Sequence, residues 1–131
     1  MPTFLLPKHK DTVAIMNSPR LIDADALIAA LQRFADERDW QPFHTPRNLM
    51  LALTGEVGEL AEIFQWLTDD EAARLADDPA RYTHLQEEIA DVLLYLVRLA
   101  SVMQVDLNQA VADKLVKNAI KYPAPVAKAE T

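Results

Sequence analysis

The chain has 131 residues, half of them hydrophobic and a quarter charged, so it is long enough for one globular domain with an apolar core. It contains no cysteine, which excludes disulfide bonds, thiolate zinc sites and cysteine nucleophiles. Its 13 basic and 20 acidic residues give a net charge of −7, which disfavours binding to a nucleic-acid polymer or an anionic membrane. No apolar run approaches ~20 residues, so no membrane span is predicted. The Phe4–Leu6 run is too short for a signal peptide, and we expect a cytoplasmic protein.

The first part of the chain predicts a tail followed by two helices. Residues 1–20 contain three prolines and no clear period, so we expect a tail or arm there. Asp23 can cap a first helix, in which apolar residues recur at helical spacing to about Arg38. Thr45–Pro46 is typical of a helix start and opens a second predicted helix that ends near Leu67.

The rest of the chain also has helical patterns. We predict a short helical turn over residues 68–76, a long helix over 78–105 and a last helix over 106–122. A proline ends the last helix, and residues 124–131 are expected to form a loose tail. No segment shows strand-like alternation. The predicted fold is therefore all-α and similar to a four-helix bundle, with one helical domain over residues 21–123.

The chain's only two glycines, Gly55 and Gly58, lie inside the second predicted helix. Glycine in a helix interior costs on the order of 1 kcal/mol relative to alanine, so the pair needs a reason. The pattern indicates that a substrate or a neighbouring helix approaches this backbone closely. Because carboxylates surround the glycines, the approaching group is expected beside acidic side chains.

Two pairs of acidic residues at three-residue spacing are the strongest functional signal. Glu56 and Glu59 lie in the second predicted helix, and Glu88 and Asp91 lie in the third. At 100° per residue, each pair falls on the apolar sector of its helix, where the interior of a bundle is expected. One such pair is most often a solvated surface or part of a salt bridge, but four converging acids repel one another unless cations neutralise them. The pairs therefore predict a divalent-cation site, and Glu62 could reach its edge.

The ligand types indicate which metal this site would hold. Carboxylates without cysteine suit Mg²⁺, with Mn²⁺ as a second possibility. A di-iron bundle needs a histidine three residues after a glutamate on each of two helices. None of His9, His44 and His84 follows a glutamate at that spacing, so di-iron is disfavoured.

The acid pattern resembles that of the MazG-like all-α nucleoside triphosphate pyrophosphohydrolases, and of the dCTP pyrophosphatase branch in particular. The likeness covers about residues 25–123. Besides the four acids, it is carried by Arg38–Trp40, Phe43–His44, Pro46–Leu49, Gly55–Trp66, Glu87–Leu93, Asn118 and Lys121–Pro123.

The resemblance implies hydrolysis of a (deoxy)nucleoside triphosphate to the monophosphate and pyrophosphate, as in nucleotide house-cleaning. It makes the two acid pairs, Glu56 with Glu59 and Glu88 with Asp91, the Mg²⁺ ligands. A carboxylate not fully engaged by metal, Glu59 or Glu62, would orient or deprotonate the attacking water, and the sequence leaves open which. The expected substrate is dCTP or a modified dCTP, while dUTP and noncanonical purine triphosphates also stay open.

Aromatic and polar residues near these motifs are the expected substrate contacts. A flat base can stack on aromatic rings, and an asparagine offers a donor and an acceptor to a base edge. Core packing or a solvated surface is the alternative role for each of these residues. The candidate substrate-binding residues are Trp40, His44, Arg47, Trp66, Tyr95, Lys114, Asn118, Lys121 and Tyr122.

The third predicted helix is apolar nearly all round from Val92 to Val97, as is typical of a helix buried on all sides. Together with the resemblance, this pattern predicts a homo-oligomer, a tetramer of paired dimers with the active site near a subunit interface. Two other functions remain open. A nucleotide sensor that does not hydrolyse would use the same residues, whereas a helical interaction module would not explain the inward acids or the glycines.

Overall fold

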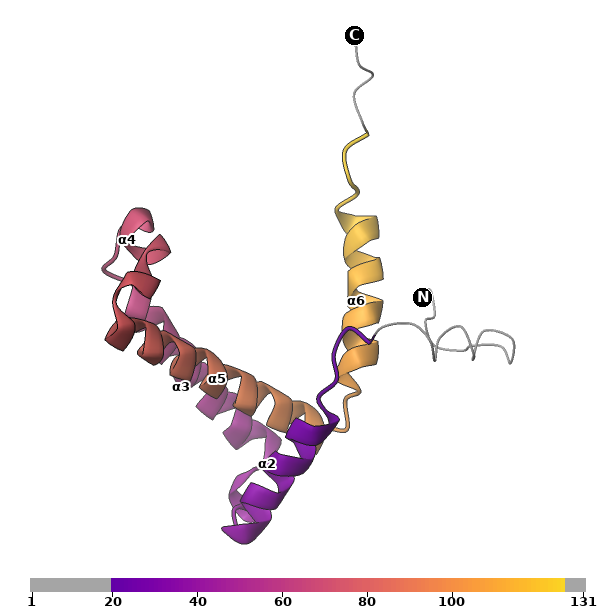
Figure 1. The fold of residues 1–131 in the computed structure, drawn as a ribbon. Helices are drawn as coiled ribbons and strands as arrows, with labels where there is room; N and C mark the ends of the chain where they lie inside the picture. Colours follow the sequence, from indigo (N-terminus) through magenta and orange to yellow (C-terminus); the bar gives the residue numbers. More distant parts are fainter. Residues whose placement is uncertain (1–19, 127–131) are drawn as a thin grey trace. The chain divides into compact units, whose positions relative to one another are not determined.

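The computed structural model describes residues 20–126, so nearly all of the predicted arm 1–20 and most of the predicted tail 124–131 lie outside the described residues. Every regular element between residues 20 and 126 is helical and none is a strand, which confirms the all-α prediction (Figure 1). No helix in this range is long and apolar enough to cross a membrane. The elements are α2 (Asp25–Glu37), η1 (Gln41–Phe43), α3 (Pro46–Phe64), α4 (Asp69–Ala73), η2 (Leu75–Asp77), α5 (Pro79–Val102) and α6 (Leu107–Lys121).

Contacts between residues divide the chain into two compact units. One unit spans residues 25–104 and contains α2, α3, α4 and α5. The other contains, among the described residues, 20–24 and 105–126, which include α6. Both acid pairs therefore belong to the unit of residues 25–104.

The starts of α3 and α5 follow from their sequences. Thr45 caps α3, because its Oγ1 accepts a hydrogen bond from the backbone N–H of Asn48 at 3.2 Å, and Pro46 occupies the first turn. Asp78 caps α5, and its Oδ1 accepts from the backbone N–H of Ala80 at 3.1 Å. Local sequence thus defines where both acid-bearing helices begin.

Two observed helix ends come earlier than the sequence predicts. α3 ends at Phe64 rather than near Leu67, and α5 ends at Val102 rather than near Val105. Gln104 has a φ of 56°, in the left-handed region. A residue in that conformation cannot continue a right-handed helix, which explains the earlier end of α5.

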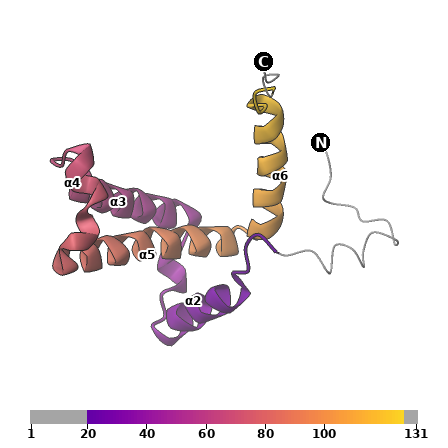
Figure 2. The same cartoon turned by 45° about the horizontal axis from the view of Figure 1, so that its top comes forward.

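Within residues 25–104, α3 and α5 run side by side in opposite directions, and α2 packs against α5 (Figure 1 and Figure 2). The largest fully buried side chain is Leu49 of α3, which is 1% exposed. Leu53 of α3, Val97 and Ala100 of α5 and Ala35 of α2 are also buried. Burial of apolar surface contributes about 25 cal/mol per Å², so this contact between α3 and α5 holds the acid pairs at a fixed separation.

One apolar side of α5 stays exposed in the single chain. Ile89 and Leu93 are each 50% exposed, and Leu96 is 44% exposed. The described residues therefore leave this side of α5 uncovered. The predicted oligomer would supply the missing surface and remains a prediction.

In the second unit, side chains at the start of α6 hold backbone groups. Asp106 caps the helix, because its Oδ1 accepts from the backbone N–H of Gln109 at 3.0 Å. Asn108 Oδ1 accepts from the backbone N–H groups of Leu21 and Ile22, at 3.0 and 3.1 Å. The segment before α2 is thereby tied to the first turn of α6.

No neighbouring element of the described chain approaches the two glycines of α3. A Cβ built on Gly55 or Gly58 meets no such heavy atom within 4 Å. A neighbouring helix of the same chain is therefore not what requires glycine here. A substrate or a second chain remains the predicted reason.

Gly58→Ala should raise the free energy of unfolding by about 1 kcal/mol, because alanine favours the helix and its Cβ meets open space. Urea denaturation at neutral pH measures this change. Ala61→Gly, at an exposed position of the same helix, is the matched control and should lower stability by a similar amount. A loss of stability in Gly58→Ala alone would show that another molecule or chain packs on this glycine in solution.

Candidate metal centre

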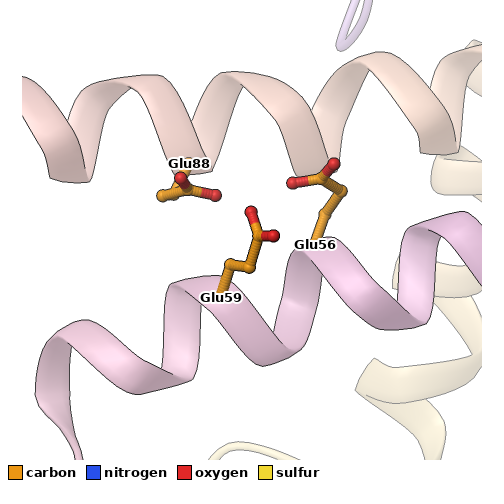
Figure 3. A group of neighbouring side chains, drawn as sticks. All are labelled: Glu56, Glu59 and Glu88. Carbon is orange, nitrogen blue, oxygen red and sulfur yellow. The ribbon is translucent and has the colours of Figure 1, made fainter.

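The pairing of α3 with α5 brings three glutamates together. Glu56 and Glu59 extend from α3, and Glu88 extends from α5 toward them (Figure 3). One carboxylate oxygen from each residue lies within 4.8 Å of the corresponding oxygens of the other two. Carboxylate oxygens that converge from two helices can coordinate one hard cation.

Two oxygens of this cluster are buried without a hydrogen-bond partner. Glu88 is 8% exposed, Glu56 is half-buried and Glu59 is exposed. The unpartnered atoms are Oε2 of Glu56 and Oε2 of Glu88. A buried polar atom without a partner costs about 1–3 kcal/mol, and more when it is charged. A cation bound between the helices would remove this cost, so the burial supports a metal site.

Charge repulsion within the cluster supports the same interpretation. Burial raises the pKa of Glu56 above its ordinary value of 4.5, and the charges of Glu59, Asp91 and Glu88 raise this pKa further. A hydrogen bond between the Glu56 and Glu59 carboxyl groups acts in the same direction. The cluster therefore binds positive charge readily, and its all-carboxylate oxygen donors suit Mg²⁺ or Mn²⁺.

The other two predicted acids lie near the cluster but outside it. Asp91 acts electrostatically on Glu56 and lines a cavity beside the cluster. Glu62 is exposed and lines a separate recess. The structure thus groups Glu56, Glu59 and Glu88, and it places Asp91 in the cavity wall. The other residues that line the recess are Ile63, Gln65, Arg81 and His84.

His84 is a neighbour of the cluster that the sequence analysis did not select. Its Nε2 lies 3.2 Å from Oε1 of Glu88, and His84 precedes Glu88 by one turn of α5. This contact holds one oxygen of Glu88 and leaves the buried Oε2 for another partner. The four-residue spacing between His84 and Glu88 was the available signal, because residues so spaced on a helix are neighbours.

The cavity beside Asp91 has a volume of about 170 Å³. Its walls come from α2, from the connector after α2 and from α5. The rings of Phe34 and Trp40 meet edge-on with centroids 5.4 Å apart, and the Trp40 and His44 centroids are 5.8 Å apart. Three of the predicted substrate contacts, Trp40, His44 and Tyr95, come together here. The lining residues are Leu31, Phe34, Trp40, His44, Asp91, Leu94, Tyr95 and Arg98.

Arg98 is a buried wall residue that the sequence analysis also missed. It is 5% exposed; its Nε donates to Nδ1 of His44 at 3.1 Å and its Nη1 donates to Oε1 of Gln32 at 2.7 Å. The sequence offered only a spacing, since Asp91, Tyr95 and Arg98 fall on one side of a helix. Spacing alone gives no information about partners on other elements.

Six predicted substrate contacts remain, two in the unit of residues 25–104 and four in the other unit. Arg47 is exposed in the first turn of α3, and Trp66, just after α3, is 86% exposed. Four others lie in the unit that contains α6, where Lys121 Nζ is 5.2 Å from the centroid of the Tyr122 ring. Substrate contact by all six stays a prediction. These four residues are Lys114, Asn118, Lys121 and Tyr122.

Comparisons with known proteins show the family to which this helical chain belongs. The model of the MazG-like family matches residues 52–130, and the chain belongs to this family. A pyrophosphatase from Archaeoglobus fulgidus has a similar solved structure, with a TM-score of 0.72 and 39% identity, covering 82% of this chain and 98% of that one.

Curated relatives narrow the similarity further. The chain is 54% identical over 98 residues to dCTP pyrophosphatase 1 of Homo sapiens, a match that covers 75% of this chain and 58% of that protein. It is 58% identical over 90 residues to the Mus musculus protein of the same name, a match that covers 69% of this chain and 53% of that protein. The chain thus spans a little over half the length of these relatives.

The raised pKa of Glu56 predicts how the stability of the metal-free protein depends on pH. The folded protein keeps this proton to higher pH than the unfolded chain does. The free energy of unfolding should therefore fall as pH rises from about 4.5 through the raised pKa. Added Mn²⁺ should oppose the fall at neutral pH, and thermal unfolding in EDTA and in Mn²⁺ measures both effects.

Glu59→Gln should reduce this fall, because it removes the neighbouring charge that acts most strongly on Glu56. Other groups titrate in the same range, so the informative quantity is the difference between variant and wild type. Glu87→Gln, which removes an exposed charge of α5, is the matched control. Equal pH dependence in wild type and Glu59→Gln would contradict mutual repulsion in the cluster.

Proposed function

We propose that this protein is a Mg²⁺-dependent nucleoside triphosphate pyrophosphohydrolase that converts dCTP, or a modified dCTP, to the monophosphate and pyrophosphate. The observation that carries this proposal is the group Glu56, Glu59 and Glu88, with two buried unpartnered oxygens, beside an aromatic cavity. Similarity to dCTP pyrophosphatase 1 and to an archaeal pyrophosphatase supports the same activity. We place this function in one helical domain, residues 21–123, of a cytoplasmic protein.

The residues present fit a divalent cation. Glu56, Glu59, Glu88 and Asp91 would hold it, since their oxygens are the donors that Mg²⁺ and Mn²⁺ prefer. A cation held by these residues would supply positive charge that offsets the charge developing on the phosphate oxygens of the triphosphate. Without it, the carboxylates would repel a substrate that carries several negative charges.

A carboxylate must also position the attacking water. Glu59 is the exposed member of the acid cluster, and Glu62 lies one turn further along α3. Either can accept a proton from a water aligned with the phosphorus under attack. We assign this role to the pair and keep both residues as candidates.

The cavity beside Asp91 is the proposed base site. Trp40 and Phe34 form an aromatic wall, and Tyr95 lines the same space. Stacking of a base on such rings contributes about 1–3 kcal/mol and tolerates every base, so it binds the nucleotide without selecting it. His44 is the proposed polar contact at this wall. We propose further substrate contacts from Arg47, Trp66, Lys114, Asn118, Lys121 and Tyr122.

We also propose that the protein acts as a homo-oligomer, a tetramer of paired dimers. The exposed apolar side of α5, with Ile89, Leu93 and Leu96 half-exposed, supports association. Open space beside Gly58 is consistent with the approach of a second chain or a substrate.

Incubation with dCTP and Mg²⁺ should yield dCMP and pyrophosphate in equal amounts, and EDTA should abolish the reaction. Asp91→Asn should lower turnover by at least ~100-fold while circular dichroism stays helical, because it removes a charge required for the cation. Glu87→Gln is the control and should keep wild-type turnover. Tight dCTP binding without any pyrophosphate would favour a sensor, and full activity of Asp91→Asn would remove Asp91 from the site.

Base choice gives a separate prediction. Trp66→Ala should raise KM by similar factors for dCTP, dTTP, dUTP and dATP, because stacking is tolerant of the base. Asn118→Ala should instead reduce the difference in kcat/KM between dCTP and the other three triphosphates. The reason is that a side chain that hydrogen-bonds to the base edge distinguishes one base from another. If Asn118→Ala lowers all four values equally, Asn118 contacts sugar or phosphate rather than the base.

A further inference from the structure

The guanidinium of Arg98 is buried beside the proposed base site without a carboxylate partner. Its side chain is 5% exposed, and no salt bridge to it occurs among residues 20–126. Its two hydrogen bonds go to neutral acceptors, Nδ1 of His44 and Oε1 of Gln32. A guanidinium has five N–H donors, so three remain for other acceptors.

The side chain of Gln32 is oriented by a charged group. Gln32 Nε2 donates to Oδ1 of Asp36 at 2.8 Å, and Gln41 Nε2 donates to the same oxygen. The amide nitrogen of Gln32 therefore faces Asp36, and its carbonyl oxygen faces Arg98. This chain of hydrogen bonds holds the guanidinium in place from α2.

The bond from Arg98 determines which nitrogen of His44 carries the proton. Nδ1 accepts a hydrogen bond from Nε of Arg98, so Nδ1 carries no proton. A neutral imidazole then has its proton on Nε2, which becomes a donor. Burial lowers the pKa of His44 and the charge of Arg98 lowers it further, which keeps the ring neutral. The charged residues that line the cavity around His44 are Asp91 and Arg98, both from α5.

These groups give the cavity a polar edge made of donors. His44 offers Nε2–H, Arg98 offers its remaining N–H groups, and both residues line the cavity. No hydrogen bond to Nε2 of His44 occurs among the described residues. Such an edge matches adjacent acceptors on a flat ring. In cytosine, O2 and N3 are two neighbouring acceptors, while the 4-amino group is a donor.

We propose that Arg98 sets specificity in two ways, by offering N–H donors to the ligand and by fixing His44 as the neutral tautomer protonated on Nε2, so that the cavity reads the O2 and N3 acceptor edge of a pyrimidine. The choice of a nucleotide ligand rests on the proposed function, whereas the tautomer of His44 does not. A purely structural Arg98 would link α2, the connector and α5 without controlling His44.

Long-range ¹H–¹⁵N NMR of the uniformly labelled full chain reads the tautomer directly. Variants His9→Gln and His84→Gln assign the remaining signal to His44. We expect the Nε2–H pattern in the wild type, persisting to lower pH than for a histidine of ordinary pKa. In Arg98→Met, the pKa of His44 should rise, because the charge of Arg98 no longer lowers it while burial still does. The ring should also populate both tautomers, because the N–H donor to Nδ1 is gone.

Gln32→Met is the matched control, because it breaks the other hydrogen bond of Arg98 and should leave the His44 tautomer unchanged. An Nδ1–H pattern for His44 in the protein with native Arg98 would overturn the proposal, and this outcome does not depend on whether Arg98→Met folds. Unchanged His44 signals in a folded Arg98→Met protein would also overturn it.

Substrate analogues test the acceptor edge. 3-Deaza-dCTP lacks the N3 acceptor, and the triphosphate of pyrimidin-2-one deoxyriboside keeps both acceptors but lacks the 4-amino group. For the wild type, kcat/KM should fall by roughly 10- to 100-fold with 3-deaza-dCTP, because a buried donor is left unpaired. In Arg98→Met, the ratio of kcat/KM for dCTP to that for 3-deaza-dCTP should be several-fold smaller than in the wild type, mainly through KM. The ratio for dCTP to the analogue without the amino group should be the same in both proteins. An equal dCTP to 3-deaza-dCTP ratio in both proteins would overturn the role proposed for Arg98.

The two proposals fail in different ways. If no triphosphate is hydrolysed, the proposed function fails, and titration with dCMP then tests the acceptor edge by binding alone. The Nε2 signal of His44 should shift on addition of dCMP and should not shift with the 3-deaza analogue of dCMP. A shift of equal size with both nucleotides would show that the cavity does not read N3.

Discussion

The central constraint in this molecule is that hydrophobic packing holds mutually repelling carboxylates together. Buried side chains such as Leu49 and Val97 bring α3 against α5, and the same contact forces Glu56, Glu59 and Glu88 to within 4.8 Å of one another. Without the cation, the apolar contact must outweigh both the repulsion and the desolvation of two unpartnered oxygens. A site of this kind is prepared for a cation before one arrives. The folding energy has already offset the electrostatic cost of bringing the ligands together.

One face of α5 connects the different parts of the site. His84, Glu88, Asp91, Tyr95 and Arg98 follow one another at intervals of three or four residues, over about 21 Å of helix. The first contacts the acid cluster, the next two supply carboxylates, and the last two line the aromatic cavity. A single helix thereby carries residues of both the proposed metal site and the proposed base site. A shift of α5 relative to α3 would disturb both together, which would couple recognition of a base to binding of a metal.

The sequence predicted what depends on local pattern and missed what depends on distant partners. Helical periodicity and capping residues gave the all-α fold, and the phase of the acids placed Glu56, Glu59 and Glu88 correctly toward one space. Arg98 was missed because its partners His44 and Gln32 lie 54 and 66 positions away, where spacing carries no information. The expectation that further subunits cover the apolar helix over 78–105 stays a prediction, because an apolar pattern does not say which molecule supplies the covering surface.

The bonds from Asn108 to Leu21 and Ile22 have a consequence for synthesis on the ribosome. One side-chain oxygen satisfies two backbone donors that lie 86 and 87 positions earlier. Residues 25–104 can fold before α6 has emerged, since their contacts are internal. The segment before α2 must wait for Asn108, and until then its two N–H groups are bonded only to water. Attachment of Leu21 and Ile22 through Asn108 is therefore among the last events of folding during synthesis.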